Sequence, residues 1–188
     1  MGSAGRDDAA MVGLPAWPYD EHQRCDGCGF DPREVRDRDL PKAVRAMGDR
    51  WVVFIDSFEH RYDHGDELLH GHPGAGLPSA QEDGRHLRDR LLALTPHVET
   101  ALATGAAPPH WRDEPDAEAW PGADDDDPDV LVGQITSATD RLADVLGAAP
   151  AAASDPSDAM RIARFALHEG YHHLAVAERS VADQLPET

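Results

Sequence analysis

The side chains with the greatest capacity for chemistry in this sequence are histidines, which number 11 in 188 residues. His168 and His172 stand four residues apart in the segment ALHEGYHHL, so a helix would place them on one face. Two neutral imidazoles at this spacing can bind one metal ion together. The apolar neighbours Phe165 and Val176 indicate that this face points inward, where buried imidazoles need partners for their nitrogens. The pair therefore predicts a metal site, although a single His-x-x-x-His pair is weak evidence in a histidine-rich chain.

Such a metal site needs a third ligand from another element. His86 and His97 lie on the second expected helix, about three turns apart, and the hydrophobic pattern does not choose between them. His60 and His64 form another pair at spacing four, but they adjoin a glycine-rich loop, and we interpret them as solvated. His173 is turned by about 100° from its neighbour around a helix, so one ion is not expected to use both.

The two cysteines, Cys25 and Cys28, stand in the segment CDGCG and are spaced to share one metal ion. A structural zinc ion needs four ligands, so His22, His60 or His64 would have to complete such a site. We favour the simpler interpretation of two reduced cysteines in a packed turn. No βαβ pattern surrounds them, which argues against a redox pair, and two cysteines are too few for a disulfide scaffold.

Hydrophobic periodicity predicts helices that would position these residues. The first is expected over residues 41–64, with apolar side chains at steps of three and four. Residues 65–78 are rich in glycine and proline and are expected to form a loop. Ser79 and Glu82 have the spacing of a capping box, which would start a second helix that bends near Pro96.

The second half of the chain is expected to contain two more helices. The acidic, proline-rich residues 104–128 have no regular pattern, but Trp111 and Trp120 indicate that parts of this long loop pack against the core. A third helix is expected over residues 129–147. A fourth is expected to run from an Asp155–Pro156 N-cap to about residue 184.

Four long helices and little strand signal predict an all-α fold, a four-helix bundle. We expect residues 1–39 to form an irregular N-terminal arm that carries the Cys-x-x-Cys segment. Residues 40–184 are expected to form the metal-binding bundle, interrupted by the long acidic loop.

The charge of the chain limits its partners. Acidic residues number 36 and basic residues 17, for a formal net charge of -19. This balance excludes ordinary nucleic-acid binding, which needs Lys and Arg against phosphates, and it disfavours anionic membranes. No apolar run is long enough to span a membrane, and the N-terminus does not have the pattern of a signal peptide, so we expect a cytoplasmic protein.

Three segments occur in a characteristic order. They are SAQEDGRHLRDRL at residues 79–91, WRDEPDAEAW at 111–120 and LHEGYHHL at 167–174, preceded by CDGCGFD from Cys25. Together they resemble the DinB-like (YfiT-like) family of four-helix bundle proteins, which includes mycothiol- and bacillithiol-dependent S-transferases. The resemblance covers about residues 25–180. The Trp-Ser that precedes the second helix in the family is Leu77-Pro78-Ser79 here, a departure that could reshape a substrate pocket.

By position, the resemblance implies that His86, His168 and His172 are the metal ligands. In the family the metal is usually zinc and sometimes nickel. Three protein ligands leave a position open for water or a thiolate, as catalytic zinc requires. The resemblance also implies that homodimers can form.

The activity implied by the resemblance is metal-dependent thiol S-transfer. A low-molecular-weight thiol such as mycothiol would bind the ion and ionise, and its thiolate would attack a small-molecule electrophile. Arg88 or Tyr171 are candidates for orienting the substrate. Asp89 is a candidate acceptor for a histidine N–H, but pairing with Arg85 or Arg88 explains it equally well.

Two other functions fit the same residues. The first is a metal-binding bundle without catalysis, in a regulatory or stress-related role. The second is a metal-dependent hydrolase with Glu169 as general base, although a helix rotates this residue about 100° from His168. Thiol-dependent turnover would separate a transferase from a hydrolase.

Overall fold

The computed structural model describes residues 22–61, 64–75, 77–109, 111–112, 127–149 and 158–185. Across these residues the chain is all-helical and has no strand, as the hydrophobic periodicity predicts. Two short 3-10 helices, η1 and η2, precede five α-helices. Their bounds are η1 Pro32–Glu34, η2 Asp37–Asp39, α1 Leu40–Arg61, α2 Gly65–His70, α3 Ala80–Thr104, α4 Pro128–Gly147 and α5 Asp158–Ala182.

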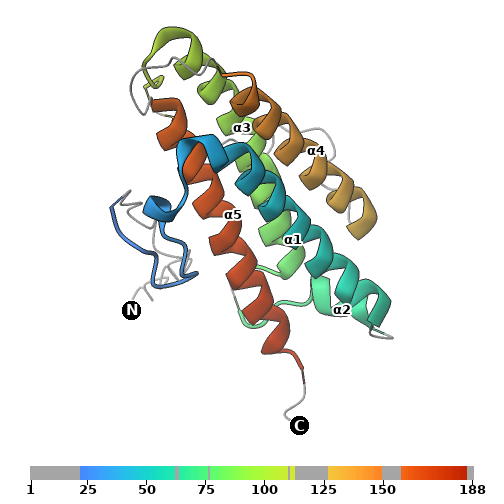
Figure 1. The fold of residues 1–188 in the computed structure, drawn as a ribbon. Helices are drawn as coiled ribbons and strands as arrows, with labels where there is room; N and C mark the ends of the chain where they lie inside the picture. Colours follow the sequence, from blue (N-terminus) through green and yellow to red (C-terminus); the bar gives the residue numbers. More distant parts are fainter. Residues whose placement is uncertain are drawn as a thin grey trace, which may run out of the picture.

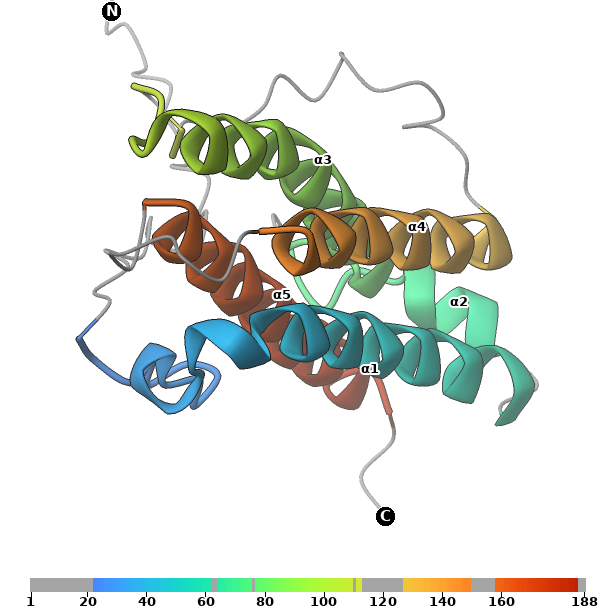
Figure 2. The ribbon, with the colours of Figure 1, turned by 45° about the horizontal axis from the view of Figure 1, so that its top comes forward.

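The four long helices lie side by side around one hydrophobic core (Figures 1 and 2). Helix α3 packs against α5 and α4, and α1 packs against α4 and α5. The short helix α2 contacts α1 and α3. No helix in the described part of the chain is long and apolar enough to cross a membrane.

The periodicity of α1 accounts for its place in the core. Val44, Met47 and Trp51 recur at steps of three and four, and all three are fully buried. The indole Nε1 of Trp51 donates a hydrogen bond of 3.0 Å to the carbonyl oxygen of Gly170, so a buried polar group joins α1 to α5. This contact lies within the turn of α5 that carries the paired histidines.

Two hydrogen bonds confirm the predicted start of α3. The backbone N–H of Glu82 donates to Ser79 Oγ at 3.2 Å, and the backbone N–H of Ser79 donates to Glu82 Oε2 at 2.8 Å. Both bonds satisfy N–H groups that a helix start leaves unpaired. Pro96 lies inside α3, and Gly105 caps its end with φ of 79°.

The prediction of a loop over residues 65–78 is wrong for its first part, where the chain forms α2. Asp66 and Glu67 lie in the first turn of α2, where acidic groups favour a helix, and Leu69 is buried. Six residues are too few to show a hydrophobic period, so packing against α1 and α3 decides the conformation.

The two helices predicted for the second half of the chain are confirmed over the described residues. The expected third helix is α4, and the expected fourth helix is α5. Trp111 is buried with its ring 5.3 Å from that of Phe165 and nearly perpendicular to it. Trp120 and the Asp155–Pro156 cap lie outside the described residues.

The described part of the N-terminal arm, residues 22–39, lies along α5 (Figure 1). The ring of Phe30 stacks on that of Tyr171 at 5.6 Å. Arg164 donates to the carbonyl oxygen of Val35 at 3.0 Å, and it also pairs with Asp37. These contacts hold the cysteine-bearing segment against the helix that carries His168 and His172.

Candidate metal centre

Helix α5 places the rings of His168 and His172 close together. His168 is only 2% exposed, and its ring lies 5.5 Å from that of His172. Burial lowers the pKa of His168 to about 4, and repulsion from the neighbouring histidines adds to this effect. Burial also lowers the pKa of His172. Both rings are therefore neutral near pH 7, as metal ligation requires.

A tight turn brings the two cysteines to these rings. The backbone N–H of Cys25 donates to the Phe30 carbonyl oxygen at 2.8 Å, and that of Gly29 donates to the Cys25 carbonyl oxygen at 2.8 Å. Gly29 has φ of 76°, a region that favours glycine. A Cβ at Gly27 would lie 3.0 Å from Cε1 of His172, so the close approach of turn and helix requires a small residue.

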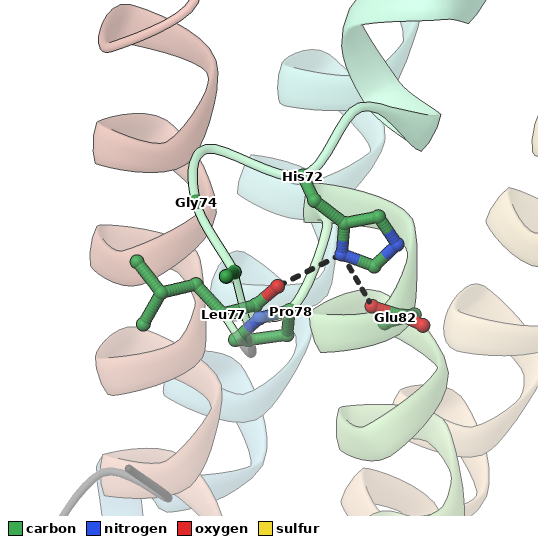
Figure 3. A pocket seen from close by; sticks show the side chains of 6 residues that line it. His72, Gly74, Leu77, Pro78 and Glu82 are labelled. Carbon is green, nitrogen blue, oxygen red and sulfur yellow. Dashed lines mark hydrogen bonds and ion pairs between the residues drawn. The ribbon is translucent and has the colours of Figure 1, made fainter. Parts of the chain in front are cut away.

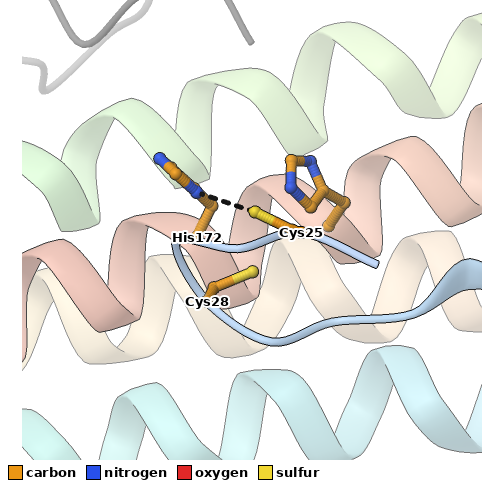
Figure 4. Close-up of side chains that lie close together, drawn as sticks. Cys25, Cys28 and His172 are labelled. Carbon is orange, nitrogen blue, oxygen red and sulfur yellow. Dashed lines mark hydrogen bonds between the residues drawn. The ribbon is translucent and has the colours of Figure 1, made fainter. Parts of the chain in front are cut away.

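The turn and α5 together form one cluster of four possible metal ligands. The Sγ atom of Cys25 lies 3.6 Å from Nδ1 of His172 (Figure 4). One ligand atom from each of the four side chains lies within 4.8 Å of the others. A tetrahedral zinc ion spaces such ligands by roughly 3.3–3.8 Å, so side-chain adjustments of about 1 Å would close the cluster onto an ion. We name this group the thiol–imidazole cluster; its members are Cys25, Cys28, His168 and His172.

The thiol of Cys28 is protonated near neutral pH in the absence of a metal. Burial raises the pKa of Cys28 to about 11, against a smaller opposing effect of the hydrogen bond from the Phe30 backbone. A bound zinc ion would displace thiol protons, because the thiolate is the ligand. Metal binding here is therefore expected to release protons.

A second cluster lies between α3 and α5. Possible ligand atoms of its three side chains lie within 4.8 Å of one another. We name it the imidazole–carboxylate cluster; its members are His86, Glu169 and His173. The rings of His86 and His173 are 4.4 Å apart, and burial lowers the pKa of His86 to about 3, with repulsion from His173 as the next cause.

The structure divides the predicted ligand set between these two clusters. His168 and His172 lie together, as their spacing predicts, whereas His86 lies beside His173. The three histidines do not form one ligand group among the described residues, and the set implied by the resemblance stays a prediction. His97, the other candidate from α3, belongs to neither cluster.

Cys25 and Cys28 lie close to two histidines that are not among their expected partners. The expected partners are His22, His60 or His64. His22 and His64 lie in neither cluster, and the side chain of His60 is outside the described residues. The interpretation of a simple packed turn overlooked His168 and His172. Both motifs were visible in the sequence, but only folding joins segments that are 147 residues apart.

Asp89 takes the second of the two roles that its sequence position allows, pairing with an arginine. The Arg88 Nε atom donates to Asp89 Oδ1 at 2.7 Å, so Asp89 pairs with an arginine. Another carboxylate of α3, Asp83, contacts a histidine of the second cluster: its Oδ1 lies 2.7 Å from Nδ1 of His173. Sequence reasoning missed Asp83, although its position three residues before His86 places both on one side of α3.

A cavity of about 270 Å³ borders the thiol–imidazole cluster. The Arg50 guanidinium lies over the Tyr171 ring at 5.5 Å. The residues that line the cavity include Cys28, Phe30, Asp31, Arg50, Leu167 and Tyr171. This cavity reaches a possible metal ligand, Cys28, and offers charged and aromatic side chains.

A broader, open hollow of about 750 Å³ lies at the loop before α3 (Figure 3). His72 Nδ1 lies 2.8 Å from the Leu77 carbonyl oxygen and 3.6 Å from Glu82 Oε2. This is the region where Leu77-Pro78 replaces the pattern of the resembling family. Among the described residues, His72 belongs to neither cluster.

No protein-family model matches the chain, and no curated protein or solved structure is detectably similar to it. The resemblance to the DinB-like family therefore stays a prediction, and the geometry of the two clusters is the observation that bears on function.

Proposed function

We propose that this protein binds one zinc ion through the thiol–imidazole cluster. The observation that carries the proposal is the convergence of Cys-x-x-Cys and His-x-x-x-His, two metal-ligand motifs, from opposite ends of the chain. Two thiolates and two neutral imidazoles are a standard donor set for tetrahedral zinc. Magnesium and calcium prefer oxygen ligands, so the donor set argues against them.

Four protein ligands complete a tetrahedral zinc shell and leave no position for a substrate. The zinc would therefore act mainly as a structural link that fastens the turn at residues 25–30 to α5. The depressed pKa values of His168 and His172 support this role, because the rings need no deprotonation before they bind.

The proposed fold for this role is a four-helix bundle of α1, α3, α4 and α5, of the DinB-like type. Its support is the pairwise packing of these helices around one core and the order of the resembling segments. The zinc would then fasten the N-terminal arm to the outside of the bundle.

A thiol S-transferase is a second candidate function, and the cavity beside Cys28 favours it. Its volume of about 270 Å³ is close to the lower end for small-molecule sites. Arg50 and Tyr171 could hold a polar thiol there. Turnover of a low-molecular-weight thiol with a panel of electrophiles would support this function, and Arg50→Ala should then raise KM. Absence of turnover in zinc-loaded protein would leave the structural role.

The zinc proposal is tested by loading the metal-free protein with Co²⁺, which reports thiolate ligands through an intense near-ultraviolet charge-transfer band. We expect the band in the wild type and its loss in Cys25→Ser/Cys28→Ser. His97→Ala removes a histidine outside both clusters and should leave the band unchanged. A wild-type protein that binds Co²⁺ without this band would contradict the proposal.

A further inference from the structure

The imidazole–carboxylate cluster is a second candidate site on a neighbouring face of the same helix, where Glu169 Oε1 lies 3.8 Å from Nδ1 of His168. We propose that it holds a second divalent transition-metal ion, with an open coordination position for water. Its three side chains come from α3 and α5, and their possible ligand atoms lie within 4.8 Å of one another. The proposal goes beyond zinc binding at the thiol–imidazole cluster and does not depend on it.

The hydrogen bond of His173 indicates which ring nitrogen is available. Its Nδ1 lies 2.7 Å from Oδ1 of Asp83, so Nδ1–H donates to that carboxylate. The Nε2 atom lies 4.0 Å from Glu169 Oε2, within the cluster. In metal sites a carboxylate commonly accepts the second N–H of a ligating histidine, which fixes the ring and raises its basicity.

The burial of Asp83 strengthens this argument. The residue is only 2% exposed, and a buried carboxylate is costly unless positive charge or N–H donors surround it. The hydrogen bond from His173 offsets part of this cost, and a metal ion on Nε2 would add positive charge behind the ring. The Asp83–His173 pair is therefore well suited to a metal on the far side of the imidazole.

An ion pair with Arg90 is the competing explanation for the position of the Glu169 carboxylate. The Arg90 Nε atom lies 3.6 Å from Glu169 Oε2, and Arg90 is 1% exposed. If pairing with Arg90 were the whole role of Glu169, no metal would bind beside His86. A carboxylate can nevertheless contact a guanidinium and a metal at once, because its two oxygens accept about four interactions.

The donor set determines the chemical class of the ion and what it could do. Two imidazoles and one carboxylate are found at catalytic zinc and non-haem iron(II) sites, which keep positions open for water or substrate. No thiolate belongs to this cluster, so it differs from the thiol–imidazole cluster in its spectroscopic signature. A bound water at such a site would be a stronger acid than free water.

The proposal is tested by Co²⁺ titration of the full-length protein, following metal per chain and the thiolate band together. We expect two ions in the wild type and one in Cys25→Ser/Cys28→Ser, the latter without the band. We expect His86→Ala to bind one ion and to keep the band. Glu169→Gln and His86→Gln nearly preserve the side-chain volume and should also lose the second ion. Circular dichroism checks that each variant keeps its helical content.

Several outcomes would overturn the second site. One is a wild-type protein that binds a single ion with a thiolate band, which would leave the zinc proposal intact. Another is a second ion that survives His86→Ala and Glu169→Gln. Loss of the thiolate band in His86→Ala, with helical content retained, would indicate one shared site and would overturn both proposals. The control His97→Ala should bind two ions.

Discussion

At the scale of single residues, the proposed zinc site depends on how closely a loop can approach a helix. Gly27 stands against the ring of His172, and Gly29 adopts a backbone conformation that favours glycine. The cysteines supply the chemistry, and the glycines allow the thiols to reach the imidazoles.

We expect Gly27→Ala to weaken zinc binding by about tenfold, or about 1.4 kcal/mol. The added Cβ would lie 3.0 Å from Cε1 of His172, so the ring or the turn must shift. Competition with a chromophoric chelator measures the change. Gly133→Ala, where a Cβ meets nothing within 4 Å, is the matched control and should leave affinity unchanged. Equal affinities for both variants would contradict the geometry of the turn.

A second expectation at this scale concerns acid. The folded protein holds the pKa of His168 at about 4, below the ordinary value of 6.5. The unfolded chain therefore takes up its proton first, so stability is full above pH 6.5 and falls as the pH drops toward 4. For His168 alone, the loss in the metal-free protein should reach about 3 kcal/mol at most.

Urea unfolding of the metal-free protein at pH 7 and pH 4.5 measures this loss. His168→Gln does not titrate in this range, so its stability should fall less steeply between the two pH values than that of the wild type. The same decrease in both proteins would show that His168 does not drive the acid sensitivity.

At the scale of elements, α3 carries His86 and Asp83, and its start is defined by the capping box. We expect Ser79→Ala to lower the free energy of unfolding by about 1 kcal/mol, because the backbone N–H of Glu82 loses the hydroxyl oxygen that accepts its hydrogen bond. Chemical denaturation measures the change. Ser137→Ala, on the exposed face of α4, is the control and should shift stability by less than about 0.5 kcal/mol. A smaller effect at Ser79 than at Ser137 would contradict the cap.

The elements show how far the sequence could predict the structure. Periodicity and capping signals are local, and they located α1, α3, α4 and the described part of α5 correctly. The helix α2 was missed because its six residues gain their conformation from packing. Periodicity also placed His173 apart from His172, and the structure assigns them to different clusters.

The sequence predicts only one part of the candidate metal site, the pairing of two histidines on α5. The spacing of His168 and His172 is a property of one helix, so it could be read directly. Their meeting with Cys25 depends on where the arm crosses α5, which no local pattern encodes. The ligand set with His86 is implied by a resemblance and stays a prediction; in the structure the His86 ring lies 4.4 Å from that of His173.

At the scale of the whole molecule, zinc would join the N-terminal arm to the helical core. Phe30, Arg164 and Arg179 make contacts across this junction. Removing the metal should therefore loosen the arm more than the core, because binding energy is lost only where the ion is bound.

We expect a chelator to increase the rate of tryptic cleavage after Arg24 by at least about tenfold, in line with the loss of a local constraint. Mass spectrometry of early fragments measures the cleavage site and rate. Restoring Zn²⁺ should restore protection, whereas Mg²⁺ should not. Cleavage after Arg24 that is equally fast with and without zinc would show that the ion does not hold the arm.

The most direct test of the central claim is X-ray absorption at the zinc edge, on protein loaded with one equivalent of Zn²⁺. The thiol–imidazole cluster predicts two sulfur ligands at about 2.3 Å and two nitrogen ligands at about 2.0–2.1 Å. A shell of nitrogen and oxygen alone would contradict the account. That result would instead favour a site built from histidines without Cys25 and Cys28.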